Sequence, residues 1–207
     1  MITLRALIPS DQTLQRPVIG ITESEKNQLK TAIDKWGQQA KAAKSHKSVR
    51  YIVERDKLLT EWLFHTGMRI SDALSIKLRD ISMENEEVTF IVKKRSRTRP
   101  FVHTIILSKE ILFDIQRFKE MFLIEPEMKL FDLTRATFDE NLAKYCKLAG
   151  LQKYSAHKFR HGCAMKDLDE GMPDFVTSFR LAHSNTGVTN AIYRRMSAKY
   201  ERQFRQL

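Results

Sequence analysis

The segment SAHKFRHGC, residues 155–163, places two histidines and an arginine within five positions of each other. His157 precedes Arg160 by three positions and His161 by four, so these side chains share one face if the segment is helical. A guanidinium can hold a phosphate through two hydrogen bonds, and an imidazole can accept a proton near neutral pH. These residue types therefore suit chemistry on a phosphate group.

Two other interpretations of this segment stay open. Histidines four positions apart on a helix can bind zinc, although Arg160 between them is a poor neighbour for a metal cation. The histidines could also be buried and bonded to the backbone. The choice depends on whether other segments carry matching residues.

A second arginine, Arg69, follows a glycine in HTGMRISDAL, residues 65–74. Taken alone, it would be an ordinary surface cation or a salt-bridge partner. Together with Arg160, it can grip the two non-bridging oxygens of a phosphodiester. The pair favours a phosphate site over a zinc site.

The segment RLAHSNTGVTNAIYRRM, residues 180–196, supplies His183 and, ten positions later, Tyr193. A tyrosine here would ordinarily be a packing residue. Arg194 and Arg195 follow it directly, and cations stabilise a phenolate, so Tyr193 can be a nucleophile. With a lysine to protonate the leaving oxygen, the set predicts metal-free phosphoryl transfer through a phosphotyrosine.

Helices must position most of these residues. We expect helices over residues 23–40, 51–66, 72–78, 109–123, 135–149, 156–169, 173–181 and 186–193 and after residue 197. Side chains suited to cap helix starts are Thr22 (in a capping box with Glu25), Ser71, Ser108, Thr134 and Ser197. Gly67 and Gly171 suit helix ends, and Pro173 suits a first turn.

Two strands are expected at residues 87–93 and 100–107, because both segments are rich in β-branched and aromatic residues. Between them, KKRSRTR holds five cations in seven positions, which predicts a β-hairpin with a basic tip. A second basic stretch, residues 41–50, connects two helices. The predicted fold class is mainly α with a small antiparallel β-sheet (α+β), preceded by an extended arm at residues 1–20.

The formal net charge is +11 over 207 residues, with a pI near 9.7. Such an excess favours a polyanionic partner, usually nucleic acid, although a basic surface can also serve solubility. The two cysteines lack metal-ligand spacing, which fits a reducing cytosol and a cytoplasmic location. No apolar run approaches the roughly 18 residues of a membrane span, and the N-terminus is too polar for a signal peptide.

In their order and spacing, these motifs resemble the tyrosine recombinase (phage integrase) family. The resemblance covers about residues 20–200. It assigns HTGMRISDAL to the first-arginine box, SAHKFRHG to the H-x-x-R-H box, RLAHSN to the L-G-H box and AIYRRM to the nucleophile segment. The 23-residue step from Arg160 to His183 makes the set specific.

Three positions depart from the family pattern. Asp72 replaces a glutamate, and Ala182 replaces the glycine before the late histidine. The hairpin lacks the usual G-K-G tip, so the catalytic lysine is either Lys94, to which counting from the strand start points, or Lys93. Neighbouring strand residues face opposite ways, so we expect only one of them to reach the cleaved phosphate.

The resemblance implies a catalytic domain over residues 21–207, without the separate N-terminal core-binding domain of many relatives. The chain would then be a fragment or a minimal recombinase. The implied function is site-specific DNA recombination through a 3′-phosphotyrosyl intermediate, encoded by a mobile genetic element and requiring neither cofactor nor metal. Three alternatives stay open: a type IB topoisomerase, a non-catalytic DNA-binding protein and a metal-dependent hydrolase.

The resemblance also implies roles for individual residues. The catalytic set is Arg69, Lys94, His157, Arg160, His183 and Tyr193, with His161 as support. Expected phosphate contacts on the basic surface are Lys44, Lys47, Arg50, Lys77, Lys93, Arg95, Arg97, Arg99, Arg194 and Arg195. The implied partners are double-stranded DNA, copies of this chain in a tetramer on two DNA sites, and accessory DNA-bending proteins. The short C-terminal tail is also compatible with a monomer in the absence of DNA.

Overall fold

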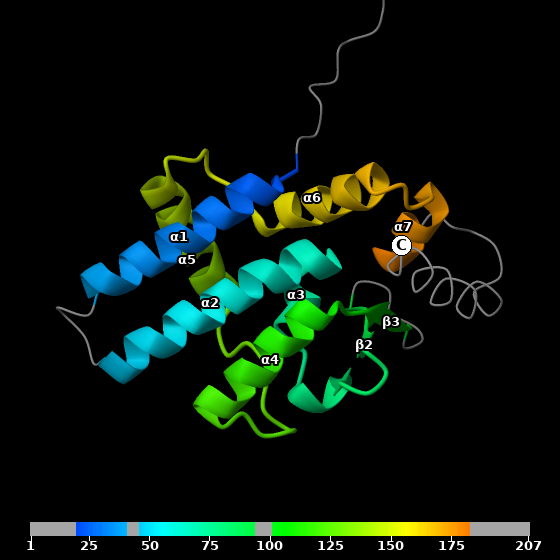
Figure 1. Ribbon diagram of the computed structural model, residues 1–207, viewed down its shortest axis with the longest axis horizontal. Helices are drawn as coiled ribbons and strands as arrows, with labels where there is room; N and C mark the ends of the chain where they lie inside the picture. The colour runs from blue at the N-terminus through cyan, green and yellow to red at the C-terminus, as the bar shows by residue number, and fades with distance from the viewer. Residues whose placement is uncertain (1–19, 41–45, 94–100, 183–207) are drawn as a thin grey trace, which may run out of the picture.

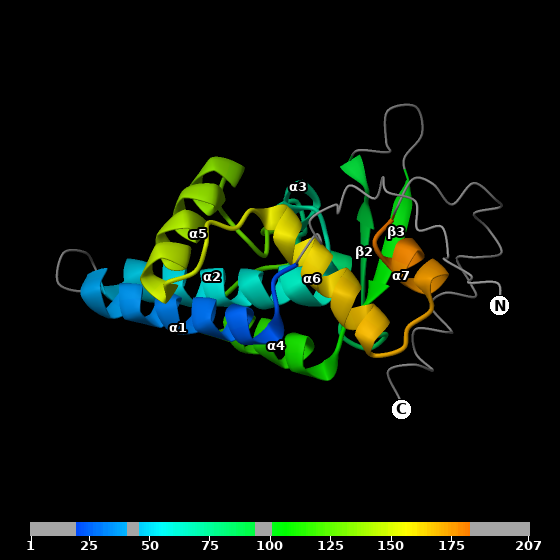
Figure 2. The same ribbon diagram turned by 90° about the horizontal axis from the view of Figure 1, so that it is seen from above.

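The structure of the protein is a computed structural model that describes residues 20–40, 46–93 and 101–182. In chain order the elements are α1 (Glu23–Ala40), α2 (His46–Thr66), α3 (Ile70–Ala73), η1 (Leu78–Asp80), β1 (Ile81–Ser82), β2 (Glu87–Ile91), β3 (Val102–Ile106), α4 (Lys109–Phe122), α5 (Arg135–Ala149), α6 (Ala156–Asp169) and α7 (Asp174–Arg180). Helices make up most of the molecule, and the small sheet lies at one end of it (Figures 1 and 2), which confirms the predicted fold class.

The helix starts that were predicted from capping side chains are largely confirmed. Thr22 and Glu25 form a reciprocal capping box at α1, with Thr22 N donating to Glu25 Oε2 at 2.8 Å and Glu25 N donating to Thr22 Oγ1 at 3.2 Å. Ser108 and Thr134 accept hydrogen bonds from backbone amides in the first turns of α4 and α5. These interactions are local, which is why the sequence predicts them.

Three helices have boundaries that differ from the prediction. Helix α2 begins at His46, so residues 46–50 are helical and do not belong to a connecting segment. Helix α3 begins at Ile70 and ends at Ala73 instead of Leu78, so Ser71 lies inside it. Its N-cap residue is Arg69, whose side chain makes no capping hydrogen bond. Pro173 is the N-cap of α7, one position before its first turn.

The sheet has the antiparallel order β1-β2-β3. β2 pairs with β3 from Glu87↔Ile106 to Ile91↔Val102, as expected for a hairpin. Both strands are shorter than predicted, and the two-residue β1 was not predicted because so short a segment carries no periodic pattern. The inward residues of β2, Val88 and Phe90, are buried.

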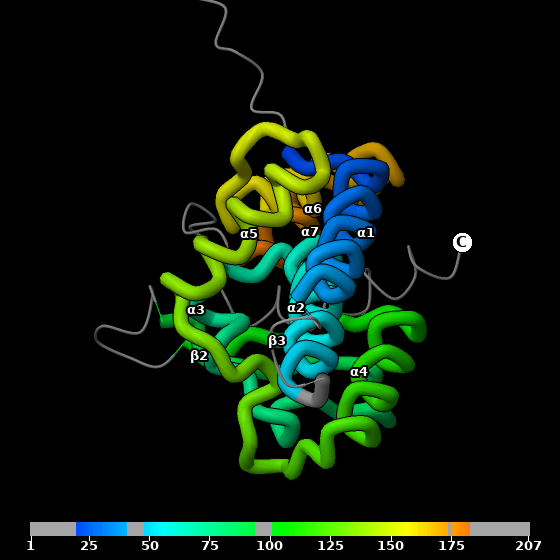
Figure 3. The backbone as a smooth tube through the Cα atoms, turned by 90° about the vertical axis from the view of Figure 1, so that its left-hand side faces the viewer, coloured from blue at the N-terminus to red at the C-terminus, as the bar shows by residue number. Residues whose placement is uncertain are grey.

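The hydrophobic core joins α1, α2, α4, α5 and α6. Figure 3 shows α1 running along α2 with α5 beside it. Three aromatic residues are fully buried: Trp62 of α2, Phe159 of α6, and Phe131, which lies between α4 and α5. The rings of Trp62 and Phe131 meet edge to face, with centroids 5.8 Å apart. This packing holds α6 against α2 and therefore sets the relative positions of the two arginine motifs.

Several predictions lie outside the described residues. These are the arm at residues 1–19, the basic stretch at 41–45, the hairpin tip at 94–100 and the two helices expected after Ala182. Within the described ranges, none of the helices has the length and apolar character needed to cross a membrane.

Candidate active site between α3, α5 and α6

A cleft of about 710 Å³ opens between the start of α3, one side of α5 and the start of α6. Three of the predicted catalytic residues, Arg69, His157 and Arg160, line it together. Arg69 is 88 positions from His157 in the sequence, so only the packing of α6 on α2 brings them together. The other residues that line the cleft are Met68, Ile70, Ser71, Arg135, Asp139, Glu140, Ala143, Lys153, Tyr154, Ser155 and Ala156.

The turn between α2 and α3 delivers Arg69 to the cleft. Gly67 has a φ of +60°, a left-handed conformation in which a side chain is disfavoured. This residue ends α2, and the chain then runs extended through Arg69, whose φ and ψ are −68° and 141°. Arg69 is half-buried and therefore accessible from the cleft.

The Arg160 guanidinium is buried, with 4% of the residue exposed, and it joins two distant segments. One terminal nitrogen donates to the Gly67 carbonyl at 2.8 Å, and the other donates to the Leu181 carbonyl. Burial, reinforced by the nearby charge of Arg69, lowers the pKa of Arg160 to about 10, while Cys163 and Asp72 act in the opposite direction. Arg160 therefore remains a cation at neutral pH and is fixed in place before any ligand binds.

The two histidines of α6 contact each other, with ring centroids 4.5 Å apart and planes nearly perpendicular at 83°. His157 is exposed and lines the cleft, whereas His161 is half-buried and does not line it. Burial, with the nearby charges of Lys158 and Arg160, lowers the pKa of His161. A neutral His161 at physiological pH suits the supporting role expected from the sequence.

Asp72 is a site residue that the sequence identified only as a substitution for glutamate. The residue is 1% exposed, and one of its carboxylate oxygens accepts a 3.2 Å hydrogen bond from the Lys93 backbone amide. Burial raises the pKa of Asp72, although the Lys93 amide and the charges of Arg69, Lys93 and Arg160 act against that rise. Asp72 therefore links the end of the β2 segment to the arginines of the cleft.

Lys93 lies at the edge of this cleft. Its ammonium nitrogen donates to the Ser71 carbonyl at 3.0 Å, and Ser71 is a lining residue. Lys94, to which the sequence pointed first, is outside the described residues. His183 and Tyr193 are outside them as well, so the structure places three of the six predicted catalytic residues.

The lining of the cleft also includes charged residues that sequence reasoning missed. Arg135 and Lys153 add positive charge, and Asp139 and Glu140 add negative charge. Arg135 directly follows the helix cap Thr134, and the sequence signal there was interpreted only as a helix start. No local pattern in the sequence indicates that this side of α5 faces the arginines.

Only part of the predicted DNA surface is described. Arg50 is exposed on α2. Lys77 does not lie on the predicted helix but precedes η1, and Lys77 and Arg79 both form ion pairs with Glu127, at 3.1 and 2.6 Å. The other predicted contacts, apart from Lys93, lie outside the described residues or have undescribed side chains: Lys44, Lys47, Arg95, Arg97, Arg99, Arg194 and Arg195.

The zinc interpretation of His157 and His161 concerns residues within the described ranges. Within those ranges, no group of three or more His, Cys, Asp or Glu residues is placed to hold a metal ion. Besides the carboxylates of Asp139 and Glu140, the cleft gathers guanidinium, ammonium and imidazole groups, which are suited to binding an oxyanion.

Comparisons with known proteins point to one family. Residues 37–199 match the phage integrase family. Tyrosine recombinase XerD of Yersinia pestis is 27% identical over 165 residues, which cover 73% of this chain and 53% of the relative. Tyrosine recombinase XerA of Pyrococcus horikoshii is also 27% identical, over 72% of this chain and 53% of the relative. The chain thus spans about half the length of the curated relatives it matches.

Solved structures share the fold. The crystal structure of XerA recombinase superimposes with a TM-score of 0.62 and 18% identity, covering 88% of this chain and 65% of that chain. The structure of XerH site-specific recombinase bound to a palindromic difH substrate after cleavage gives a TM-score of 0.58 and 20% identity, over 98% of this chain and 56% of that chain. Since the family match extends over most of the sequence and the fold agrees, the chain belongs to the phage integrase family.

Proposed function

We propose that this chain carries the catalytic site of a site-specific DNA recombinase, which cleaves and rejoins duplex DNA through a 3′-phosphotyrosyl intermediate. The observation that carries the proposal is the meeting of Arg69, His157 and Arg160 in one cleft. Membership of the phage integrase family and the recombinase names of the relatives agree with it.

In the proposed first step, the Tyr193 oxygen attacks a scissile phosphate. A bond forms between the tyrosine oxygen and phosphorus, and the bond from phosphorus to the 5′-oxygen breaks. His157 accepts the tyrosine proton, and a lysine protonates the departing 5′-oxygen. The products are a 3′-phosphotyrosyl link and a 5′-hydroxyl, and the reaction consumes no external energy source.

Arg69 and Arg160 stabilise the charge that builds up on the non-bridging oxygens, and His183 donates to one of them. A guanidinium has five N–H groups, and Arg160 directs one from each terminal nitrogen at the Gly67 and Leu181 carbonyls. The remaining N–H groups can contact phosphate without disturbing those bonds. Loss of one such preorganised donor typically costs about 10²–10³ in rate.

The lysine that protonates the leaving oxygen is Lys94 or Lys93. The sequence count favours Lys94, whereas the position of the Lys93 ammonium at Ser71 supports Lys93. Separate substitution of each lysine decides between them.

A 5′-hydroxyl from a second duplex then reverses the attack, which exchanges strands. This step needs two cleaved sites near each other, so we propose a tetramer of this chain on two DNA sites, formed in the cytoplasm with or without accessory DNA-bending proteins. The exposed cations on the chain would hold the phosphate backbone, and affinity would then fall steeply with salt.

The proposal is tested by trapping the covalent intermediate. Tiled duplexes from the DNA that flanks the gene, each nicked next to a candidate cleavage point, are incubated with the protein in EDTA and separated under denaturing conditions. We expect an adduct that resists denaturation on a subset of duplexes and is lost in Tyr193→Phe, while DNA binding by that variant is retained. Cleavage that persists in Tyr193→Phe, or that requires a metal ion, contradicts the proposal.

A further inference from the structure

Helix α7 ends at a buried arginine that the proposed mechanism does not use. The Arg180 side chain is 2% exposed and forms an ion pair with Asp167 of α6, whose side chain is 3% exposed. One terminal nitrogen of Arg180 lies 2.5 Å from each Asp167 oxygen and 3.5 Å from the Cys163 sulfur. The pair is therefore removed from water and fixed on several sides.

The same arginine reaches two further elements. Its other terminal nitrogen donates to the His65 carbonyl, at the end of α2. Its own backbone carbonyl lies 2.9 Å from Nε2 of the buried His103 on β3, and because a carbonyl only accepts, this nitrogen is the donor. Arg180 thus joins α7 to α6, to the end of α2 and to the sheet.

These connections surround the point where the chain leaves α7 toward His183. The carbonyl of Leu181 accepts a hydrogen bond from Arg160, and Ala182 adopts a left-handed φ of +51°. The carbonyls of His65 and Gly67 stand two positions apart, just before Arg69, and they receive bonds from Arg180 and Arg160 respectively. Through these hydrogen bonds, the guanidiniums of Arg160 and Arg180 connect the end of α7 to the turn that carries Arg69.

A buried ion pair is a poor means of gaining stability, because desolvation of the two charges offsets their attraction. Replacing such a pair with apolar residues of similar volume is often neutral or stabilising. The pair instead specifies the orientation of the elements, since a buried charged group that needs several hydrogen-bond partners is satisfied in only one arrangement of them. An apolar contact at this position would hold α7 in place without fixing its rotation.

We propose that Arg180, held by Asp167, is a positioning residue for DNA cleavage. It fixes the end of α7 against the turn after α2, so that the Leu181 and Gly67 carbonyls hold the Arg160 guanidinium in place beside Arg69. The inference rests on the proposed function. The motifs assign no role to Asp167 or Arg180, although Arg180 directly precedes the Leu181-Ala182-His183 residues of the L-G-H box.

The test compares wild type with the double variant Asp167→Leu/Arg180→Met, which replaces both charged groups with apolar side chains. We expect a melting temperature within about 3 °C of wild type and DNA affinity within about twofold. The single-turnover rate of adduct formation should fall about 10- to 100-fold, because small misplacements of a reacting group have effects of that size. A structural role alone would not lower the rate while stability and affinity are retained.

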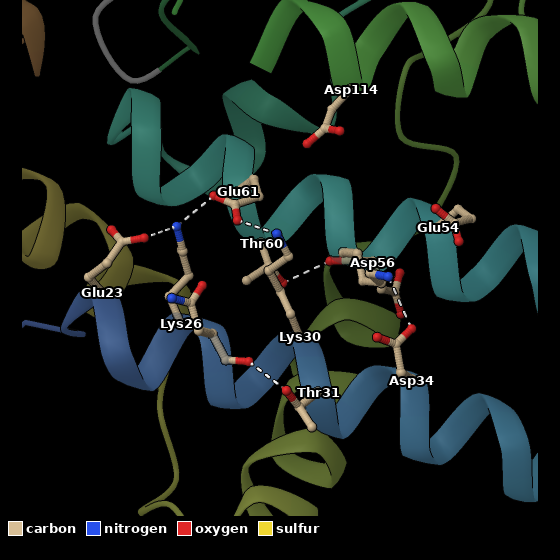
Figure 4. A network of polar contacts seen from close by, with 12 residues as sticks. Glu23, Lys26, Lys30, Thr31, Asp34, Glu54, Asp56, Thr60, Glu61 and Asp114 are labelled. Carbon is tan, nitrogen blue, oxygen red and sulfur yellow. Dashed lines mark hydrogen bonds and ion pairs between the residues drawn. The ribbon is translucent and has the colours of Figure 1, made fainter. Parts of the chain in front are cut away.

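A matched control is available in the polar network between α1 and α2 (Figure 4). Lys26, whose side chain is 7% exposed, forms a 2.8 Å ion pair with Glu61, which also pairs with Lys30. The double variant Lys26→Met/Glu61→Gln removes a largely buried pair, neither member of which lines the cleft, and leaves an acceptor for Lys30. Its cleavage rate should remain at the wild-type level.

Equal cleavage rates in wild type and Asp167→Leu/Arg180→Met overturn the inference. If that double variant is markedly less stable, Arg180→Lys replaces it, since lysine keeps the charge next to Asp167 but loses the forked reach to His65. A rate equal to wild type in this single variant overturns the inference, and a reduced rate with unchanged affinity supports it.

Hydrogen exchange separates this inference from the proposed function. The amides of Leu181 and Ala182 donate to Thr177 and Phe179 at 3.0 and 2.8 Å, so their protection reports on the end of α7. If wild type forms no adduct on any duplex, the proposed function fails. Exchange at these amides then decides the positioning claim: about tenfold faster exchange in the double variant supports it, and unchanged exchange overturns it.

Discussion

Substitution of Gly67 by alanine should damage both the fold and the cleft. At a φ of +60°, alanine carries a left-handed strain of about 1–2 kcal/mol. Its β-carbon would also overlap the Leu181 Cδ2 atom and lie 3.0 Å from the Cys163 sulfur. Overpacking of this kind costs about a further 1–3 kcal/mol, so we expect a total loss of about 2–5 kcal/mol in the free energy of unfolding.

Gly150 provides the matched control for this prediction. It has a similar φ of +69°, but a β-carbon built there meets no atom within 4 Å. Gly150→Ala should therefore lose only the strain, about 1–2 kcal/mol. Urea denaturation with an unchanged m-value measures both variants.

The same comparison extends to catalysis. Because the Gly67 carbonyl holds Arg160 and Leu181 packs against Gly67, adduct formation should slow in Gly67→Ala and not in Gly150→Ala. Equal losses of stability in the two variants would refute the reasoning, since they would mean that the predicted overlap with Leu181 has no consequence.

Three further predictions follow from individual side chains. Lys93→Ala and Lys94→Ala, assayed separately, should differ in adduct formation by about 10²-fold or more, because only one supplies the leaving-group proton; equal rates would mean that neither does. Burial raises the pKa of Asp72, so the protonated Asp72 carboxyl stabilises the fold at acid pH, and this stabilisation is lost as the pH rises through the folded-state pKa. Urea titrations at a series of pH values should therefore show that the free energy of unfolding of wild type falls, relative to that of Asp72→Asn, as the pH rises through this pKa. Glu127→Gln removes the carboxylate that pairs with Lys77 and Arg79, so the variant should bind DNA more tightly than wild type at low salt. The difference in affinity between variant and wild type should shrink at high salt, because salt screens exposed charges. A salt-independent difference in affinity would show that these cations do not contact DNA.

The parts of the fold that the sequence predicted are those with local signals. Thr22, Ser108 and Thr134 cap helices through bonds to residues three positions away, so the signal and its effect lie in one short segment. The pairing of β2 with β3 was predicted from two neighbouring segments rich in β-branched and aromatic residues, whereas their register was not predicted. Ser71, by contrast, could cap a helix, but the turn after Gly67 starts α3 at Ile70 instead.

The candidate site was predictable in its motifs and not in its supporting contacts. The order of the boxes around Arg69 and Arg160 identified the family, and the structure brings both arginines to one cleft with His157. No spacing rule links Asp72 to the Lys93 amide, or Arg180 to the His65 carbonyl, because those contacts join residues 21 and 115 positions apart. Such contacts depend on how complete elements pack, which a single sequence does not encode in any local pattern.

The most direct test of the central claim is to identify the residue that becomes attached to DNA. The trapped adduct is digested with nuclease and protease, and the peptides are sequenced by mass spectrometry. The account predicts a nucleotide linked through its 3′-phosphate to Tyr193. Attachment to any other residue, such as Tyr200 in the same tail, would contradict the account.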